Sequence, residues 1–446
     1  MPRIVAMCKE ESENVTELDE QNLFQWAQDL FPLNRSLSGE GVRETLHYLK
    51  TKLPELEIRN LNSGEAAFDW VIPKEWNVDE AYIEDSNGFR VIDFASNNLH
   101  IVGYSVSVDC WVSKAELESK IHFLEDRPDS IPYVTSYYEE NWGFCIEFNR
   151  WKELPEQLYH VVIRSELFKG VLNFGEIYLP GESKQEILLS SYICHPSMFS
   201  NEISGPVVLT ALFAQLKKNP KRHYSYRGLL LPETIGSIGY MYEHLEEMQQ
   251  RIVAGWVLTC LADEGEFSYV PSRLGRNYAD RMTLEFAEKK GVPIKHYSWL
   301  DRGSDERQYC APGVDLPICS VTRTKYGEFP EYHTSADDLD YGSSRGLFQS
   351  FTFYSELLNY LELRRTPRAT ILCEPQMGRR NLYPKISKGG GGGLGFHGIS
   401  AIQLTNFLSY ADGQHNLDEI AKLCEASLEQ TLDAFKILVR ENFVEY

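Results

Sequence analysis

The chain has 446 residues and a formal net charge of −21, with 43% apolar and 24% charged residues. This is the composition of an ordinary globular protein, and at about 100–200 residues per domain the length predicts two to four domains. The acidic balance disfavours general nucleic-acid binding and docking on anionic membranes, because both need positive charge on the protein.

The N-terminal segment and the cysteines favour a cytoplasmic location. The apolar run at residues 4–7 is too short for a signal-peptide core, and acidic residues follow it at once. No stretch of about eighteen apolar residues occurs, so no membrane span is expected. The nine cysteines are scattered and form no Cys-x-x-Cys pair, which favours reduced thiols over a disulfide framework.

Two predicted helices open the chain. Apolar residues recur at helical spacing over 22–30 and 41–53, with a break at Pro32. We assign residues 1–62 to the first part of a larger core. The following segments are short, aromatic and β-branched, with Asn, Gly, Asp and Pro between them, and predict a β-rich inserted domain over residues 63–156.

The next part of the chain, residues 157–366, alternates apolar strand-like runs with helical patterns. Helices are expected at 205–216, 240–248, 278–289 and 337–363. Strands that alternate with helices predict an α/β fold in which helices cover a sheet, so this part completes the core.

A linker and a small helical domain are expected at the C-terminal end. Residues 367–395 include five consecutive glycines at 389–393, which no regular element accommodates. Residues 396–446 predict three short amphipathic helices, the first at 399–410, and a β end, as in a winged-helix domain. Two of these helices open with capping boxes, Asn416-x-x-Glu419 and Ser427-x-x-Gln430.

The charge of this last segment bears on its partners. It holds three Lys/Arg and eight Asp/Glu, a net charge of −5, and Glu429 and Asp433 lie on its third helix. DNA binding requires the opposite sign. We therefore expect it to pack against another protein or a second copy of this chain.

The first candidate for a catalytic or metal-binding segment is LLSSYICHPSMFSNEISG. His195 follows an apolar strand, and Glu202 precedes a helix start. A histidine at the carboxyl end of a sheet strand points toward the crevice where open α/β sheets bind ligands, and a carboxylate beside it could share a zinc ion. In the alternative interpretation, His195 only ends the strand and Glu202 is favoured by the helix dipole.

Two further segments repeat this arrangement. In GLLLPETIGSIGY, Glu233 follows an apolar strand and could act as a general base beside metal-bound water, or could cap the next helix. In FPEYHTSADDLDY, His333 stands before a predicted helix start at Thr334. Asp337 and Asp338 could orient an imidazole, or could be first-turn acids favoured by the helix dipole.

The order of these motifs resembles the zinc aminopeptidase and carboxypeptidase superfamily, which has the phosphorylase/hydrolase-like fold. That superfamily runs through His-x-Asp, Asp-Asn-x-Ser-Gly, Glu-Glu-x-Gly-x-x-Gly, a later Asp, which aligns near Cys260 or Asp263 in this chain, and a final His-Thr-x-x-Asp. This chain offers His195-Pro-Ser197, Asn201-Glu202-Ile203-Ser204-Gly205, Glu233-Thr234-Ile235-Gly236-x-x-Gly239 and His333-Thr334-Ser335-Ala336-Asp337.

A narrower resemblance covers nearly the whole chain. The runs GSDERQYCAPGVDLP, from Gly303, and PEYHTSADDLD are similar to those of a bacterial aminopeptidase-like family. That family adds an inserted β domain and a winged-helix tail to a mixed-sheet zinc-exopeptidase-like core.

The resemblance implies a zinc site with altered ligands. Asn201 stands where the superfamily has a metal-bridging Asp, and Thr234 where it has a metal-binding Glu. Since Asn and Thr are poor zinc ligands, one zinc ion is expected rather than two. His195 and His333 are the expected histidine ligands. For the third ligand the first choice is Glu202 and the second is Asp263, and Glu233 matches the general base.

Five further residues are candidates for binding the substrate, a small peptide or another amide. Asp305, Glu306 and Arg307 could line the pocket, and Arg323 and Tyr326 lie near His333 in sequence. In the alternative interpretation the first three form a solvated charged loop.

Three functions remain open on the sequence alone. The leading one is a zinc-dependent amide-bond hydrolase of the aminopeptidase type. The second is an N-deacylase or amidohydrolase acting on an amino sugar or small metabolite, with Trp70, Trp76 and Trp111 available to stack on sugars. The third is a degenerate peptidase-like protein that binds a ligand without catalysis.

Overall fold

The computed structural model describes residues 18–219, 222–380, 382 and 399–446. The apolar run at residues 4–7 and the glycines at 389–393 lie outside these ranges. The chain forms two compact units, Met1–Tyr354 and Ser355–Tyr446, which are described separately. Within the described ranges no helix is both long and apolar enough to cross a membrane, and the eight cysteines found there are free.

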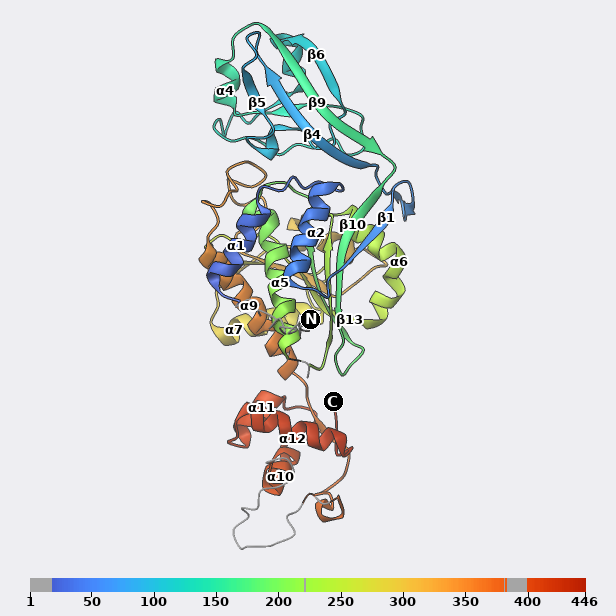
Figure 1. Cartoon of the computed structure of the whole chain (residues 1–446). Helices are drawn as coiled ribbons and strands as arrows, with labels where there is room; N and C mark the ends of the chain where they lie inside the picture. Colours follow the sequence, from blue (N-terminus) through green and yellow to red (C-terminus); the bar gives the residue numbers. More distant parts are fainter. Residues whose placement is uncertain (1–17, 220–221, 381, 383–398) are drawn as a thin grey trace, which may run out of the picture. The chain divides into compact units, whose positions relative to one another are not determined.

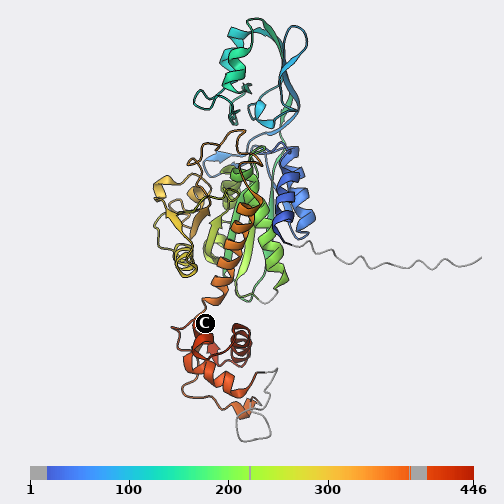
Figure 2. The same ribbon diagram turned by 90° about the vertical axis from the view of Figure 1, so that its left-hand side faces the viewer.

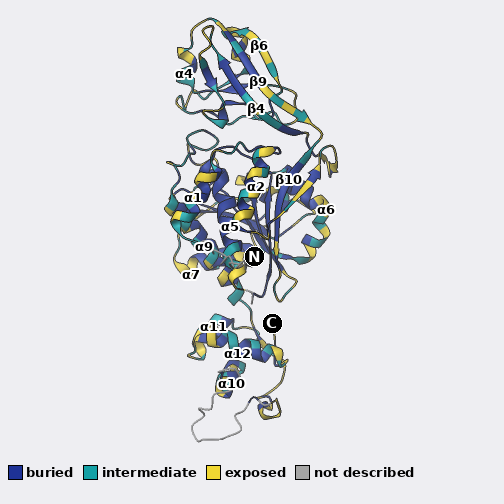
Figure 3. Ribbon diagram, in the orientation of Figure 1, coloured by how far each residue is buried: buried dark blue, intermediate teal, exposed yellow. Residues whose placement is uncertain are grey.

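An eight-stranded mixed sheet forms the centre of the first unit, in the order β1-β10-β12-β11-β13-β16-β14-β15. Four adjacent strands (β12, β11, β13 and β16) run parallel. β10 pairs antiparallel with β1 and β12, and β14 pairs antiparallel with β16 and parallel with β15. The predicted mixed α/β core is therefore confirmed, and Figure 3 shows inner strands of the sheet, such as β10, largely buried, whereas the edge strand β1 is mostly exposed. The strands are β1 (Glu57–Asn62), β10 (Val171–Leu179), β11 (Glu186–Tyr192), β12 (Ser225–Leu231), β13 (Ile252–Val257), β14 (Phe267–Val270), β15 (Ile294–His296) and β16 (Ile318–Thr322).

Helices cover this sheet (Figure 1). The helices α1, α2 and α5 contact one another, and α2 and α5 contact β10 and β11. The helix α7 contacts β13 and β16, and Figure 2 shows it, in yellow, on the opposite side of the core from the blue α1 and α2. The helices are α1 (Glu20–Leu30), α2 (Glu40–Lys52), α5 (Ser204–Lys218), α6 (Ile235–Arg251), α7 (Tyr278–Lys290) and α8 (Glu306–Tyr309).

The last long helix begins later than the sequence predicts. The helix α9 spans Ser344–Leu363, whereas residues 337–343 form turns. The carboxylate of Asp337 accepts hydrogen bonds from the backbone N–H groups of Ser200 and Asn201, at 2.7 and 2.9 Å. The predicted start at 337 was wrong because Asp337 caps a distant turn instead of its own helix.

The inserted segment has its own four-stranded antiparallel sheet, in the order β5-β4-β9-β6. Its strands are β4 (Glu75–Glu84), β5 (Arg90–Asp93), β6 (Val108–Ser113) and β9 (Leu158–Phe168), and a short β2–β3 hairpin (Ala66–Ala67 and Trp70–Val71) precedes them. Because β9 pairs with β4 and β6, the inserted sheet extends to Phe168, past the expected boundary at residue 156. Alternating apolar residues identify a strand but not the sheet it joins.

The second unit has the predicted helices, α10 (Ala401–Tyr410), α11 (Leu417–Leu423) and α12 (Leu428–Arg440). Both predicted capping boxes form. The described part of the expected linker, however, belongs to this unit. The strand β17 (Arg368–Ala369) pairs with β18 (Val444–Glu445), and Met377 and Leu382 are buried in the same core.

This pairing predicts where a stable fragment must begin. A fragment of residues 365–446 should show a cooperative thermal transition by circular dichroism. A fragment of residues 396–446 lacks β17 and Met377, and loss of a buried Met side chain alone costs about 2–5 kcal/mol. The shorter fragment should therefore lack that transition, and equal melting of the two would contradict the assignment of β17 and Met377 to this unit.

Candidate functional site

The ends of two adjacent parallel strands bring the first site residues together. β11 and β12 end level with each other, with Tyr192 opposite Leu231. His195 lies three residues beyond the first strand, and Glu233 lies two residues beyond the second. Their side chains meet, with His195 Nε2 at 3.7 Å from Glu233 Oε2. The expected position at the carboxyl edge of the sheet is thus the observed one.

A buried carboxylate, that of Glu202, contacts the Nδ1 side of the His195 ring and orients it. Glu202 Oε2 lies 2.8 Å from His195 Nδ1, which leaves Nε2 on the side of Glu233. The Arg35 guanidinium donates to the His195 carbonyl at 3.0 Å and lies 4.0 Å from Glu202 Oε1. Burial, with a further contribution from Arg35, lowers the pKa of His195 to about 3, so the ring is neutral near pH 7.

His333 approaches the same point from a strained loop. Its backbone φ is +56°, a left-handed conformation that is uncommon for a residue other than glycine. The backbone N–H of Tyr133, in the inserted segment, donates to the His333 carbonyl at 2.9 Å. The His333 ring lies 5.2 Å from the His195 ring, and burial lowers the pKa of His333 to about 3.

Glu233 begins a second strained turn. Thr234 has φ +66°, and its N–H donates to Asp305 Oδ1 at 2.8 Å. Arg307 Nη2 donates to Thr234 Oγ1 at 2.7 Å and lies 3.7 Å from Glu233 Oε1. Burial and the charge of Asp305 raise the pKa of Glu233 well above its ordinary value, and Arg307 opposes that shift. The carboxylate is therefore held as a strong proton acceptor.

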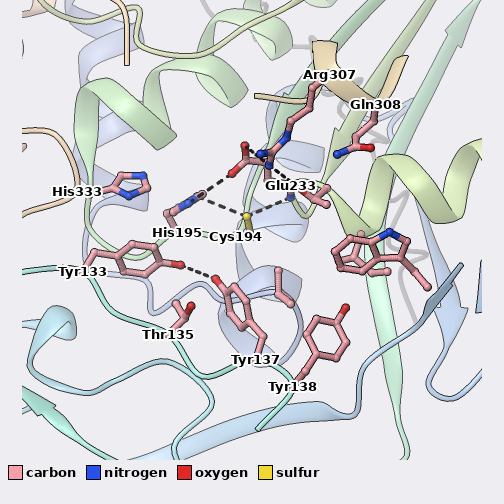
Figure 4. A pocket seen from close by; sticks show the side chains of 14 residues that line it. Tyr133, Thr135, Tyr137, Tyr138, Cys194, His195, Glu233, Arg307, Gln308 and His333 are labelled. Carbon is pink, nitrogen blue, oxygen red and sulfur yellow. Dashed lines mark hydrogen bonds and ion pairs between the residues drawn. The ribbon is translucent and has the colours of Figure 1, made fainter. Parts of the chain in front are cut away.

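These side chains line a cavity of about 620 Å³. One wall comes from the inserted segment, and in Figure 4 Tyr133 and Tyr137 point toward each other across from Arg307 and Gln308. The hydroxyl groups of these two tyrosines are hydrogen-bonded. The lining residues are Leu37, Trp70, Tyr133, Thr135, Tyr137, Tyr138, Cys194, His195, Glu233, Thr234, Ile235, Arg307, Gln308 and His333.

The cavity side carries two side chains of the kind that bind zinc. The neutral imidazoles of His195 and His333 line it, and the carboxylate of Glu233 lies beside them, with Oε2 at 3.7 Å from His195 Nε2. Among the described residues, the one group of three whose ligand atoms all lie within 4.8 Å of one another is Cys194, His195 and Glu202, but it lies on the Nδ1 side of His195, where the Arg35 cation is already present. We therefore place the candidate metal position on the cavity side.

The two positions where the resemblance places further zinc ligands carry uncharged side chains with partners inside the protein. Asn201 Oδ1 accepts from the Tyr192 hydroxyl at 3.1 Å, and that hydroxyl also bonds to Thr259. An uncharged group, hydrogen-bonded within the protein, thus occupies the position where the resemblance places a bridging Asp. Thr234, the other altered position, uses its hydroxyl to accept from Arg307.

The structure brings together only part of the predicted site. Asp263, the second choice of ligand, accepts from Thr324 and from the N–H of Gly265 instead of facing the histidines. Glu202 is not among the residues that line the cavity, and it contacts His195 on the far side from Glu233. Arg307 is the one predicted substrate residue that lines the cavity.

The other four predicted substrate residues have internal partners. Asp305 supports the turn at Thr234, and Glu306 accepts from the N–H groups of Gly303 and Ser304 and from the Tyr326 hydroxyl. The guanidinium of Arg323 donates to the carbonyl of Gly265 at 2.9 Å. Asp305, Glu306, Arg323 and Tyr326 therefore shape the loops around the cavity without lining it.

The sequence-based prediction missed the tyrosines of the inserted segment and Arg35. The run IPYVTSYYEENW carries three tyrosines within six residues, and that density was the available signal for Tyr133, Tyr137 and Tyr138. Of the three tryptophans proposed to stack on sugars, Trp70 lines the cavity, Trp76 is buried in the core, and Trp111 stacks on His160 outside the cavity lining.

Comparison with known proteins agrees with this architecture. A Clostridium acetobutylicum protein, provisionally named for polysaccharide biosynthesis and an aminopeptidase-like domain, is 40% identical over 400 residues, 90% of each chain. The crystal structure of a C. acetobutylicum protein provisionally described as a peptidase matches with a TM-score of 0.79 and 37% identity over 96% of each chain. A zinc aminopeptidase from Bacillus subtilis matches with a TM-score of 0.58 and 12% identity, over 77% of this chain and 95% of its own.

The fold and these relatives define a protein with an aminopeptidase-like core followed by a winged helix. Residues 24–364 match the model of a domain of unknown function, DUF4910, and residues 365–446 match a winged helix-turn-helix. The chain belongs to the DUF4910 family. The family resemblance predicted from the motifs is confirmed, including the winged-helix tail.

Proposed function

We propose that this protein is a zinc-dependent hydrolase that cleaves an amide bond with a single metal ion. The observation that carries the proposal is the convergence of His195 Nε2, His333 and Glu233 on one cavity at the carboxyl edge of the sheet. The aminopeptidase-like fold of the core supports it, because the zinc aminopeptidase from B. subtilis has the same fold. We assign His195 and His333 as metal ligands, with Glu202 orienting His195.

Glu233 is the general base of the proposed reaction. A zinc ion held here by His195 and His333 would lower the pKa of a bound water molecule and would polarise the scissile carbonyl. Glu233 Oε2 accepts a proton from the attacking water and returns it to the leaving nitrogen. Arg307, 3.7 Å from Glu233 Oε1, favours the ionised form of that carboxylate and so opposes the effect of burial and of Asp305 on its pKa.

Metal analysis tests the ligand assignment. Purified protein dialysed against zinc should hold about one ion per chain, because the cavity offers one set of ligands. His195→Ala and His333→Ala should each lose the ion, whereas His47→Ala, an exposed histidine on α2, should retain it. Two ions per chain would contradict the single-metal proposal, and zinc retained by both site variants would contradict the ligand assignment.

A non-catalytic binding protein is the second candidate. The observation that favours it is the pair of altered positions, Asn201 and Thr234, both engaged in hydrogen bonds within the protein. Protein that binds no zinc and hydrolyses neither aminoacyl amides nor N-acyl sugars, with zinc, cobalt or manganese added, would support this candidate over the hydrolase.

We also propose that the winged helix serves protein packing or self-association, given its net charge of −5.

A further inference from the structure

One wall of the cavity is aromatic and comes from the inserted segment. Trp70, Tyr137 and Tyr138 line it. The Trp70 and Tyr138 rings pack edge to face at 6.0 Å, yet they stay 39% and 56% exposed. Exposed aromatic surface beside a cavity is unfavourable in water and marks a place where a ligand covers it. The wall therefore suits a flat, partly apolar group.

The side of the cavity opposite the aromatic wall carries two polar side chains with planar end groups. Arg307 and Gln308, at the start of α8, line it with a guanidinium and an amide (Figure 4). Such planar groups pair with neighbouring hydroxyls, while aromatic faces pack against C–H groups. Together the two walls match a sugar ring, which presents both kinds of surface. A volume of about 620 Å³ is also within the range of small-ligand sites.

The charges around the cavity disfavour a free amine. Among the lining residues, all of which lie in the described ranges, Glu233 is the one carboxylate, and Arg307 already lies 3.7 Å from it. The nearby acids do not line the cavity: Asp305 is buried and accepts through Oδ1 from Thr234 and Ser237, and Glu306 accepts from backbone N–H groups and from the Tyr326 hydroxyl. An ammonium group bound here would lose its hydration without gaining a carboxylate of its own.

We propose that the cavity binds an N-acylated amino sugar, with the sugar ring against Trp70 and Tyr138 and the acylamino group at His195 and Glu233. This names the substrate class of the hydrolase proposed above and rests on that function for its chemistry. In the reaction the C–N bond breaks, the hydroxyl of water joins the acyl carbon, and the proton of water passes to the sugar nitrogen. The products are a carboxylic acid and a free amino sugar.

Saturation-transfer NMR on the full chain tests the proposal, because it reports binding of the sugar and does not depend on its hydrolysis. N-acetylglucosamine should receive saturation from the protein, whereas glucosamine and leucinamide, which carry free amines, should receive little. Trp70→Ala should weaken binding of N-acetylglucosamine at least about tenfold, as for other aromatic binding residues. Trp111→Ala should leave binding unchanged, because Trp111 is 54% exposed and stacks on His160 outside the cavity lining.

Three results would overturn the proposal. They are binding of leucinamide as strong as that of N-acetylglucosamine, unchanged binding of N-acetylglucosamine in Trp70→Ala, and no binding of N-acetylglucosamine to the unaltered protein. The proposed hydrolase activity fails separately, because a protein that binds the sugar through Trp70 but never releases acetate is a sugar-binding protein and no hydrolase. Trp70 lies on an exposed hairpin, so its variant should fold, and circular dichroism checks this.

Discussion

Replacement of Glu233 by Gln should lower kcat for amide hydrolysis by about 100- to 10,000-fold, the usual contribution of a general base. Gln keeps the size and one acceptor atom of Glu but cannot take a proton. His195 and His333 remain in place in this variant, so zinc content should be unchanged. The comparison requires steady-state kinetics and metal analysis on the same protein preparations.

Glu246→Gln is the matched control for this experiment. Glu246 is exposed on α6, the helix that follows Glu233 directly, so its replacement should leave both kcat and zinc content unchanged. Full activity in Glu233→Gln would remove Glu233 as the base. Loss of zinc in that variant would instead make Glu233 a metal ligand, and the proton would then need another acceptor.

Local sequence patterns sufficed to predict much of the core. Apolar runs located the strands, and because neighbouring parallel strands end at one edge, the residues after them had to meet. That geometry predicts the proximity of His195 and Glu233 without any tertiary information. The capping boxes at Asn416 and Ser427 formed as predicted because they depend on residues three apart.

The rest of the site depends on contacts between distant residues. Arg35 reaches the carbonyl of His195, 160 residues away, and no local pattern in the chain reports such a contact. Tyr133 enters the site because the inserted segment hydrogen-bonds to the loop of His333. Glu202 was predicted as the third zinc ligand, and only the structure shows that it contacts His195 Nδ1, on the opposite side of the ring from Glu233.

Asp337 shows how a correct local rule can predict the wrong partner. An acid after Thr334 fits a helix start, where the dipole favours negative charge. In the structure the carboxylate is fully buried and accepts from the N–H groups of Ser200 and Asn201 instead. These two groups belong to the turn Phe199–Ile203, which leads into α5 and carries Glu202. Asp337 thereby links the His333 loop to the residue that orients His195.

Asp337→Ala should therefore lower the free energy of unfolding by about 2–6 kcal/mol, since two buried N–H groups lose their acceptor at about 1–3 kcal/mol each. Denaturant titration followed by tryptophan fluorescence measures the loss. Asp340→Ala, an exposed acid of the same loop, should change stability by less than about 0.5 kcal/mol. Because the released turn also carries Glu202, zinc affinity should fall in Asp337→Ala and stay unchanged in Asp340→Ala. Unchanged stability and zinc affinity in Asp337→Ala would mean that the two N–H groups find other acceptors and that this link does not hold the site together.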